Sequence, residues 1–115
     1  MKVIVAGSRN IFKEILGKER LIIEESGFEI TELVCGMCQG VDLVFFNWAN
    51  ESDIIIKEFP ANWNLYGKSA GPIRNKEMAQ YANCLIAIWD GVSKGTKNMI
   101  NEMKKLNKKV YIKYV

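Results

Sequence analysis

Glycines, hydroxyl side chains and charged residues gather in three short segments, each of which follows an apolar run. The segments are "GSRN" from Gly7, "CGMCQGVD" from Cys35 and "DGVSKGTKN" from Asp90. Glycine lets the backbone approach a ligand closely, and the N–H groups at the start of a helix attract anions. These residue types predict a phosphate-binding site, to which serine and threonine hydroxyls add donors. Each segment alone fits equally well a tight turn whose serine or threonine only caps a helix.

A fourth segment, "GKSAGPIRNKEM", places a positive charge near the predicted start of a helix. If Pro72 is the first helical residue, a position that proline favours, Arg74 lies in the first turn. A cation there opposes the helix dipole and needs a partner that stabilises it. Because the guanidinium fork pairs best with carboxylates and phosphates, we expect Arg74 to bind an anionic ligand. The alternative is an internal ion pair with one of three acidic residues: Asp42, Glu77 and Asp90.

Further side chains near these segments have two interpretations each. Asn75 could read the edge of a base or ribose, or could only fill a helix turn. Trp63 and Tyr66, in the long irregular segment "PANWNLYGKSAG", are candidates for stacking on a base or for covering a helix. The three acidic residues could bind ribose hydroxyls, cap backbone donors, or act as catalytic acids or bases.

The cysteine and histidine content excludes several kinds of site. Cys35 and Cys38 form a C-x-x-C pair, but the only other cysteine, Cys84, lies in an apolar run, and there is no histidine. A structural zinc site needs four ligands, and the usual Ser-His-Asp and Cys-His catalytic sites need a histidine. We therefore expect no metal and no cofactor, whereas a redox role for the C-x-x-C pair stays open.

Length and charge limit the class of protein. The 115 residues suffice for one domain with a buried core, so residues 1–115 are treated as a single domain. The net charge of +3 comes from 16 basic and 13 acidic residues that are mixed along the chain, which disfavours a nucleic-acid partner. Lysines do gather over residues 104–113, which we interpret as a solvated surface. No apolar run reaches the length of a signal segment or a membrane span, so a cytoplasmic protein without a membrane partner is expected.

Short apolar runs alternate with segments of helical period along the whole chain. Strands are predicted at residues 3–6, 29–34, 54–59, 85–89 and 110–114. Helical stripes are predicted over residues 12–23 and 41–48, from Pro72, and over 99–106. This alternation is typical of an α/β fold with a five-stranded parallel sheet and helices on both faces, a Rossmann-like three-layer sandwich. Right-handed crossovers bring all the strand-to-helix turns to one edge of the sheet, where ligands bind in such folds.

Four ordered motifs resemble one family, the YspA-like branch of the SLOG superfamily. They are "KVIVAGSRN", "GMCQGVD", "FPANWNLYGKSAGPIRNKEM" and "LIAIWDGVSKGTKNMI", and the resemblance covers residues 2–113. It implies the strand order 3-2-1-4-5 and binding of a nucleotide or nucleotide-derived ligand. Relatives in the superfamily include the Lonely Guy phosphoribohydrolases and the DNA-processing protein DprA. Related domains form dimers through their helices, so the resemblance also implies a homodimer.

The resemblance and the residue types together predict the site. The predicted ligand-binding residues are Gly7, Ser8, Arg9, Gly36, Gly40, Asp42, Trp63, Gly71, Arg74, Asn75, Asp90, Gly91, Ser93, Gly95 and Thr96. The candidate catalytic residues are Asp42, Glu77 and Asp90. Two departures stand out: no glutamate pair follows "GT" as it does in the Lonely Guy enzymes, and "CGMCQG" replaces the branch's more usual "SGGAxG".

Three functions follow from these observations. The first is binding of a phosphate-bearing nucleotide derivative, for sensing, delivery or sequestration. The second is hydrolysis of an N-glycosidic bond in such a ligand, with a site carboxylate activating water. The third is binding of single-stranded DNA, which would need a basic groove with exposed aromatic side chains.

Overall fold

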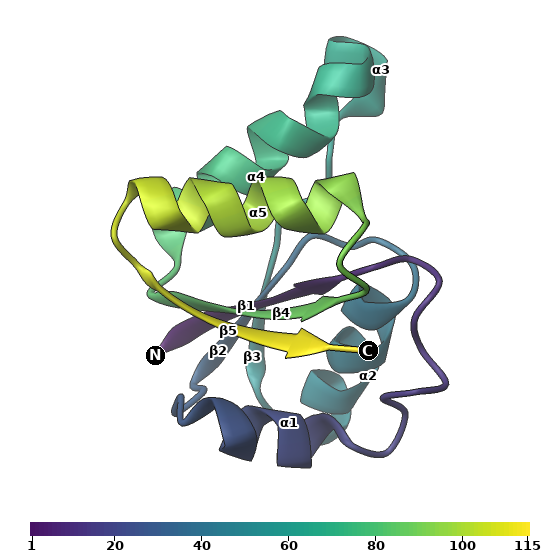
Figure 1. The fold of residues 1–115 in the computed structure, drawn as a ribbon, viewed down its shortest axis with the longest axis vertical. Coiled ribbons are helices and arrows are strands. Elements are labelled where there is room, and N and C mark those ends of the chain that lie inside the picture. The colour runs from purple at the N-terminus through teal and green to yellow at the C-terminus, as the bar shows by residue number, and fades with distance from the viewer.

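The computed structural model describes all 115 residues as a parallel sheet between two layers of helices (Figure 1). The strands are β1 (Lys2–Gly7), β2 (Glu32–Cys35), β3 (Ile55–Glu58), β4 (Cys84–Trp89) and β5 (Lys109–Tyr114). The helices are α1 (Glu19–Ser26), α2 (Val41–Glu51), α3 (Trp63–Tyr66), the 3-10 turn η1 (Gly67–Ser69), α4 (Ala70–Tyr81) and α5 (Lys94–Lys105). The sheet has the order β3-β2-β1-β4-β5, so the predicted fold class and strand order are confirmed.

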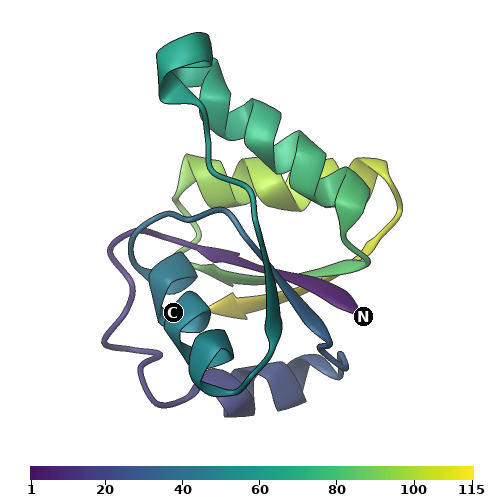
Figure 2. The same ribbon diagram turned by 180° about the vertical axis from the view of Figure 1, so that it is seen from behind.

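The sheet is buried on both faces at β1 and β4, which are apolar apart from Lys2 at the start of β1. In β1, the side chains of Val3 and Val5 pack among the core residues that face α1 and α2, and Ile4 packs among those that face α4 and α5. Figures 1 and 2 show these two helix pairs on opposite faces of the sheet. The pairing Val3 with Cys84 begins a parallel register of β1 with β4 that continues to Gly7 and Ile88. Unbroken apolar runs of this kind are typical of parallel sheets covered on both faces.

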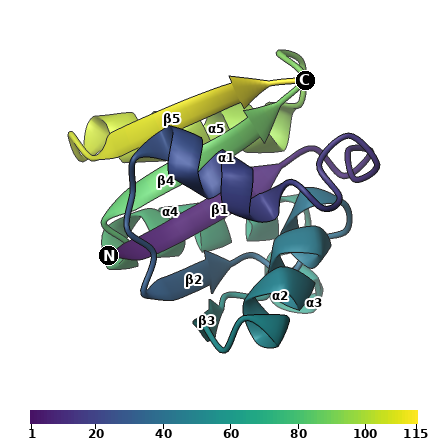
Figure 3. The same ribbon diagram turned by 90° about the horizontal axis from the view of Figure 1, so that it is seen from below.

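The strand order creates a crevice between β1 and β4. The chain builds β1, β2 and β3 outward in one direction and then returns to place β4 on the other side of β1, as Figure 3 shows. The loops after β1 and β4 therefore diverge to opposite faces of the sheet. In open α/β sheets, ligands bind at this switch point, beyond the carboxyl ends of the strands.

The first predicted helix is wrong over its N-terminal half. The apolar stripe over residues 12–23 predicted one helix, but α1 begins only at Glu19. Gly17 has a φ of 83°, a left-handed conformation that is incompatible with an α-helix running through residues 12–23. Ile15 is fully buried, whereas Phe12 and Leu16 are exposed. The first half of the predicted stripe is therefore an irregular connection in which Ile15 packs into the core.

The second strand is shorter than predicted. Residues 29–34 were expected to form it, but β2 starts at Glu32. The backbone before it bonds the chain terminus instead, since the Thr31 N–H donates to the Met1 carbonyl and the Met1 amine donates to the Glu29 carbonyl.

Helix α4 begins at Ala70, two residues before the predicted start at Pro72. It continues from α3 and η1, which project from the body of the molecule (Figure 1). Arg74 therefore lies in the second turn, and the opposition of its charge to the helix dipole is weaker than expected, because that effect falls off within the first turn.

None of the helices combines the length and the apolar character that a membrane-spanning segment needs.

Lys108, one of the lysines that gather over residues 104–113, makes hydrogen bonds to the C-terminal end of α4. The Lys108 ammonium donates to the carbonyls of Ala79, Gln80 and Ala82, at 2.7, 3.1 and 2.7 Å. These are carbonyls at the C-terminal end of the helix, where a cation is also favoured by the dipole. The interpretation of this cluster as solvated surface therefore fails for Lys108.

We expect Lys108→Met to lower the free energy of unfolding by roughly 2 kcal/mol, because three carbonyls lose a charged donor. Chemical denaturation measures the effect. Lys104→Met is the matched control, since Lys104 is exposed and its ammonium bonds nothing. Equal stability of the two variants would show that water replaces the Lys108 ammonium at no cost.

Candidate functional site

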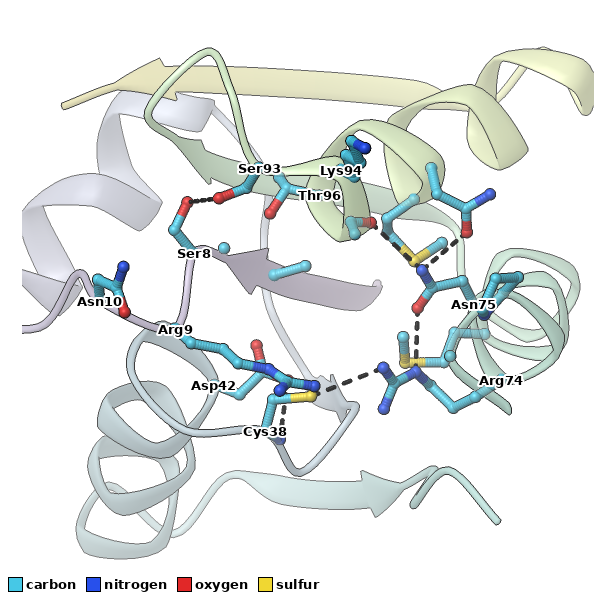
Figure 4. A pocket seen from close by; sticks show the side chains of 18 of the residues that line it. Ser8, Arg9, Asn10, Cys38, Asp42, Arg74, Asn75, Ser93, Lys94 and Thr96 are labelled. Atoms are coloured by element: carbon cyan, nitrogen blue, oxygen red, sulfur yellow. Dashed lines mark hydrogen bonds between the residues drawn. The ribbon is translucent and has the colours of Figure 1, made fainter. Parts of the chain in front are cut away.

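A cavity of about 670 Å³ lies beyond the carboxyl ends of β1 and β4. Its walls come from the loop after β1, the start of α2, the α3 and α4 region and the start of α5 (Figure 4). The predicted residues that line it are Gly7, Ser8, Arg9, Asp42, Trp63, Gly71, Arg74, Asn75, Ser93, Gly95 and Thr96. Segments far apart in the sequence thus meet at the expected edge of the sheet.

Two predicted glycines lie behind the cavity wall. A Cβ at Gly36 would lie 2.8 Å from Nη1 of Arg74. Gly40 has a φ of 72°, and a Cβ there would lie 2.4 Å from the Arg9 carbonyl oxygen. These glycines let other site residues approach, so their contribution is to packing of the site and not to its lining.

The turn after β4 contains two more predicted residues that do not line the cavity, Asp90 and Gly91. The exposed Asp90 carboxylate accepts the N–H groups of Val92 and Ser93, both at 2.8 Å. These two hydrogen bonds hold the pKa of Asp90 below its ordinary value. Gly91 has a φ of 83°, so both residues shape the turn.

Asp42 is the only candidate catalytic carboxylate that lines the cavity. Glu77 is exposed on α4 and lies outside the lining, as does Asp90. Asp42 is 5% exposed, and its Oδ2 accepts the Cys38 N–H at 3.2 Å. Burial raises its pKa to about 6, although the Cys38 bond and the charges of Arg74 and Arg9 act in the opposite direction. Asp42 can therefore exchange a proton near neutral pH.

Arg74 is buried without a carboxylate partner. Its Nη1 donates to the Gly36 carbonyl and, at 3.5 Å, to that of Phe59. Its Nη2 donates one hydrogen bond within the protein, to the sulfur of Cys38 at 3.6 Å. The ion pairs of the structure do not include it, so the alternative of an internal ion pair is not seen. A guanidinium has five N–H donors, so Nη2 keeps a donor for a ligand.

Asn75 uses both ends of its side-chain amide within the protein. The amide oxygen accepts Nε of Arg74 at 3.0 Å. The amide nitrogen donates to the Gly95 carbonyl at 3.3 Å and to Oδ1 of Asn98 at 2.9 Å. Asn75 therefore orients the arginine and ties α4 to α5, which leaves it little capacity to read a base.

The N-terminus of α5 is open to the cavity. Its N-cap residue, Ser93, makes no side-chain cap, because the hydroxyl is hydrogen-bonded to Ser8 at 2.7 Å and to Asp90 at 3.1 Å. The N–H groups of residues 94–96 precede the first intrahelical bond, from Lys97 to the Ser93 carbonyl. Thr96 is 5% exposed and its hydroxyl bonds no protein group. Such unpaired donors at a helix start form an anion site.

Trp63 lines the cavity from α3, whereas Tyr66 does not. Trp63 is about half exposed and packs beside Gly71, where a Cβ would touch its ring at 3.4 Å. The indole is thus available as a face for a base, and the stacking interpretation fits Trp63 better than Tyr66.

Several lining residues were not predicted. They are Ala6, Asn10, Cys38, Pro72, Met78, Lys94, Asn98 and Met99. Six of them lie inside the four segments singled out in the sequence, so their positions could have been predicted: Asn10, Cys38, Pro72, Met78, Lys94 and Asn98. Ala6 and Met99 lie outside these segments, and their side chains look like ordinary core residues. The described chain contains no cluster of three metal-ligating side chains.

We expect iodoacetamide to label Cys38 alone in the native protein, because Cys35 and Cys84 are fully buried and Cys38 lines the cavity. Burial also raises the pKa of Cys35 to about 12 and that of Cys84 to about 11, which suppresses their reactive thiolates. Peptide mapping by mass spectrometry should find one modified cysteine in buffer and three in denaturant. Labelling of Cys84 in buffer would contradict the packing described here.

Comparisons with known proteins support the fold. No protein-family model and no curated protein matches the sequence. The structure is similar to the X-ray structure of DNA processing protein A (DprA) from Streptococcus pneumoniae, with a TM-score of 0.78 and 16% sequence identity. The match covers 96% of this chain and 49% of the DprA chain, so this chain spans about half the length of that protein. The likeness shows that this chain shares its fold with that part of DprA.

Proposed function

We propose that this protein binds a phosphate-bearing nucleotide derivative in the cavity between β1 and β4. The observation that carries the proposal is the pairing of an uncapped N-terminus of α5 with a buried Arg74 that has no carboxylate partner. Both features leave donors unpaired at one cavity, and an anion is the partner that satisfies them. In this proposal the phosphate lies at Ser93–Thr96, Asp42 accepts ribose hydroxyls, and Trp63 covers the base.

The same residues support placing the chain in the YspA-like branch of the SLOG superfamily, because the motifs that carry the resemblance supply most of the cavity lining. We extend the proposal to a homodimer, as the resemblance implies, and to a cytoplasmic location, as expected from the short apolar runs of the sequence. The match to DprA supports a role related to nucleotides or DNA.

A second candidate function is hydrolysis of the N-glycosidic bond of the bound nucleotide. Asp42 favours it, since a cavity carboxyl with a pKa of about 6 suits general acid–base chemistry near neutral pH. Asp90 and Glu77 do not line the cavity, so Asp42 is the only one of the three candidates that could act there.

Native mass spectrometry tests both functions in one experiment. The protein is incubated with AMP, ADP-ribose and NAD, and Arg74→Ala is run beside it. Arg20→Ala is the matched control, because Arg20 is an exposed arginine on α1, on the other face of the sheet. We expect intact adducts of ADP-ribose and NAD with wild type and the control, and loss of these adducts with Arg74→Ala.

The other outcomes separate the alternatives. Release of a free base that stops in Asp42→Asn would favour the hydrolase. No adduct with any of the three nucleotides, together with salt-sensitive binding of single-stranded DNA, would favour a DNA-binding function. Equal adducts with wild type and Arg74→Ala would remove Arg74 from the proposed site.

A further inference from the structure

The donors of the cavity form two groups that come from different parts of the chain. The first, here called the helix pole, consists of residues 93–96 at the start of α5. Its free groups are the backbone N–H groups of residues 94–96, the Thr96 hydroxyl and the Lys94 ammonium. A Cβ at Gly95 would meet nothing within 4 Å, so there is space for a ligand directly against this backbone. Only 5% of the Thr96 surface is exposed, and this residue lines the cavity. Its hydroxyl nevertheless makes no hydrogen bond to the protein.

The second group, here called the arginine pole, consists of Arg9 and Arg74. Both side chains line the cavity, next to Asp42 and Cys38 (Figure 4). Two fixed positive charges face one carboxyl, so this pole keeps at least one positive charge in excess whatever the protonation state of Asp42. Nη2 of Arg74 donates one hydrogen bond within the protein, to the Cys38 sulfur, which is a weak acceptor.

The two poles lie on opposite sides of the end of β1. Figure 4 shows Ser93, Lys94 and Thr96 on one side of this strand, and Arg9, Asp42 and Arg74 on the other. The hydrogen bond between Ser8 and Ser93 closes the wall on the side of the helix pole. The Asn75 amide bonds both Arg74 and the Gly95 carbonyl, so one residue orients donors of both poles. A single phosphate held by one pole leaves the donors of the other unpaired.

We infer that the ligand carries two anionic groups, one for each pole, and thus belongs to the nucleotides with a second phosphate or carboxylate. This inference rests on the proposed function and narrows it. Ligands with one phosphate would fill the helix pole alone. The second anion would pair with Arg9 and Arg74, in contacts that are charge-assisted and shielded from solvent on the Arg74 side.

Isothermal titration calorimetry at fixed ionic strength tests the inference with three commercial probes: AMP, ADP and adenosine 3′,5′-bisphosphate. With the wild type, the tighter of the two-anion probes should bind roughly tenfold to a hundredfold more tightly than AMP. In Arg9→Gln the ratio between the affinities for the two-anion probe and for AMP should shrink to less than about threefold. Arg9 is exposed, so the variant should fold normally. Arg74→Gln provides the second variant, and circular dichroism checks its fold.

The results separate the inference from the proposed function. Equal wild-type affinity for AMP and both two-anion probes overturns the inference and leaves the proposed function standing. A two-anion advantage that survives in both arginine variants also overturns it, since the second anion would then lie elsewhere. If none of the probes binds a folded wild type, the proposed function and the inference fail together.

Discussion

Arg74→Gln is expected to weaken the binding of a nucleotide with two anionic groups by roughly tenfold to a hundredfold. The substitution removes a charge-assisted hydrogen bond to the ligand, which is worth about 1.5–3 kcal/mol. It also removes the donor to the Gly36 carbonyl. Titration calorimetry with a nucleotide that binds the wild type measures the affinity.

A second variant tests whether the position of the guanidinium matters, separately from its charge. A Cβ at Gly36 would lie 2.8 Å from Nη1 and 3.1 Å from Cζ of Arg74, so Gly36→Ala must displace the guanidinium while the charge remains. We expect Gly36→Ala to lose a large part of the same affinity. Suppose that Gly36→Ala binds the nucleotide as tightly as wild type and Arg74→Gln does not. The charge of Arg74 would then contribute to affinity, and the exact position of its guanidinium would not.

Asp42→Asn is expected to make the protein more stable at neutral pH. Burial raises the pKa of Asp42 from an ordinary value of 3.8 to about 6, so the folded state binds more protons than the unfolded state between these two values. Stability from this group therefore falls as the pH rises from about 4 to about 6, and the cost is fully present above pH 6. The difference between the two pKa values corresponds to roughly 3 kcal/mol. Asparagine avoids that cost and can still accept the Cys38 N–H.

Urea denaturation at pH 4 and at pH 7.5 measures this effect in both proteins. The stability of Asp42→Asn relative to wild type should rise by roughly 2.5 kcal/mol between the two pH values, because a small part of the cost is already present at pH 4. The matched control is Asp90→Asn, whose carboxyl is exposed and has a lowered pKa. Its contribution to stability is lost only as the pH falls below about 4, so the relative stability of this variant should change little between the two pH values. A relative stability of Asp42→Asn that does not change with pH would mean that Asp42 ionises in the folded protein as easily as in water.

The same variant separates binding from hydrolysis. If Asp42 only accepts ribose hydroxyls, its replacement should weaken nucleotide binding modestly, and the nucleotide should stay intact with both wild type and variant. If Asp42 activates water, the substrate should bind to Asp42→Asn and remain intact.

Much of the fold could be predicted from the sequence because its core strands are uninterrupted apolar runs. β1 and β4 were placed to within one residue at each end, since each contains a short apolar run followed by a turn with glycine. The strand order came from the motifs and not from the apolar pattern, which cannot tell which strands are neighbours. The first helix failed because an apolar stripe does not distinguish a helix from a loop that buries one isoleucine, here Ile15.

Prediction of the site was most successful where a residue's chemistry was visible in its type. Arg74 and Thr96 were singled out by type and position, and both line the cavity. Glu77 and Asp90 were included because they are acidic, yet their position depends on the phase of a helix and on the path of a turn. The role of Asn75 in tying α4 to α5 could not be predicted, since the acceptors of its amide nitrogen lie 20 and 23 positions away in the chain.

The missing cap of α5 has a consequence for hydrogen exchange. The middle of this helix is pinned to the sheet by Met99, Ile100 and Met103, all buried, whereas the N–H groups of residues 94–96 have no acceptor. One helix therefore combines slowly exchanging amides with amides that exchange almost as fast as those of an open chain. An anion bound at the helix start would slow the second group and leave the first unchanged. The time course of deuterium uptake in a single peptide would thus report occupancy of the site without any knowledge of the natural ligand.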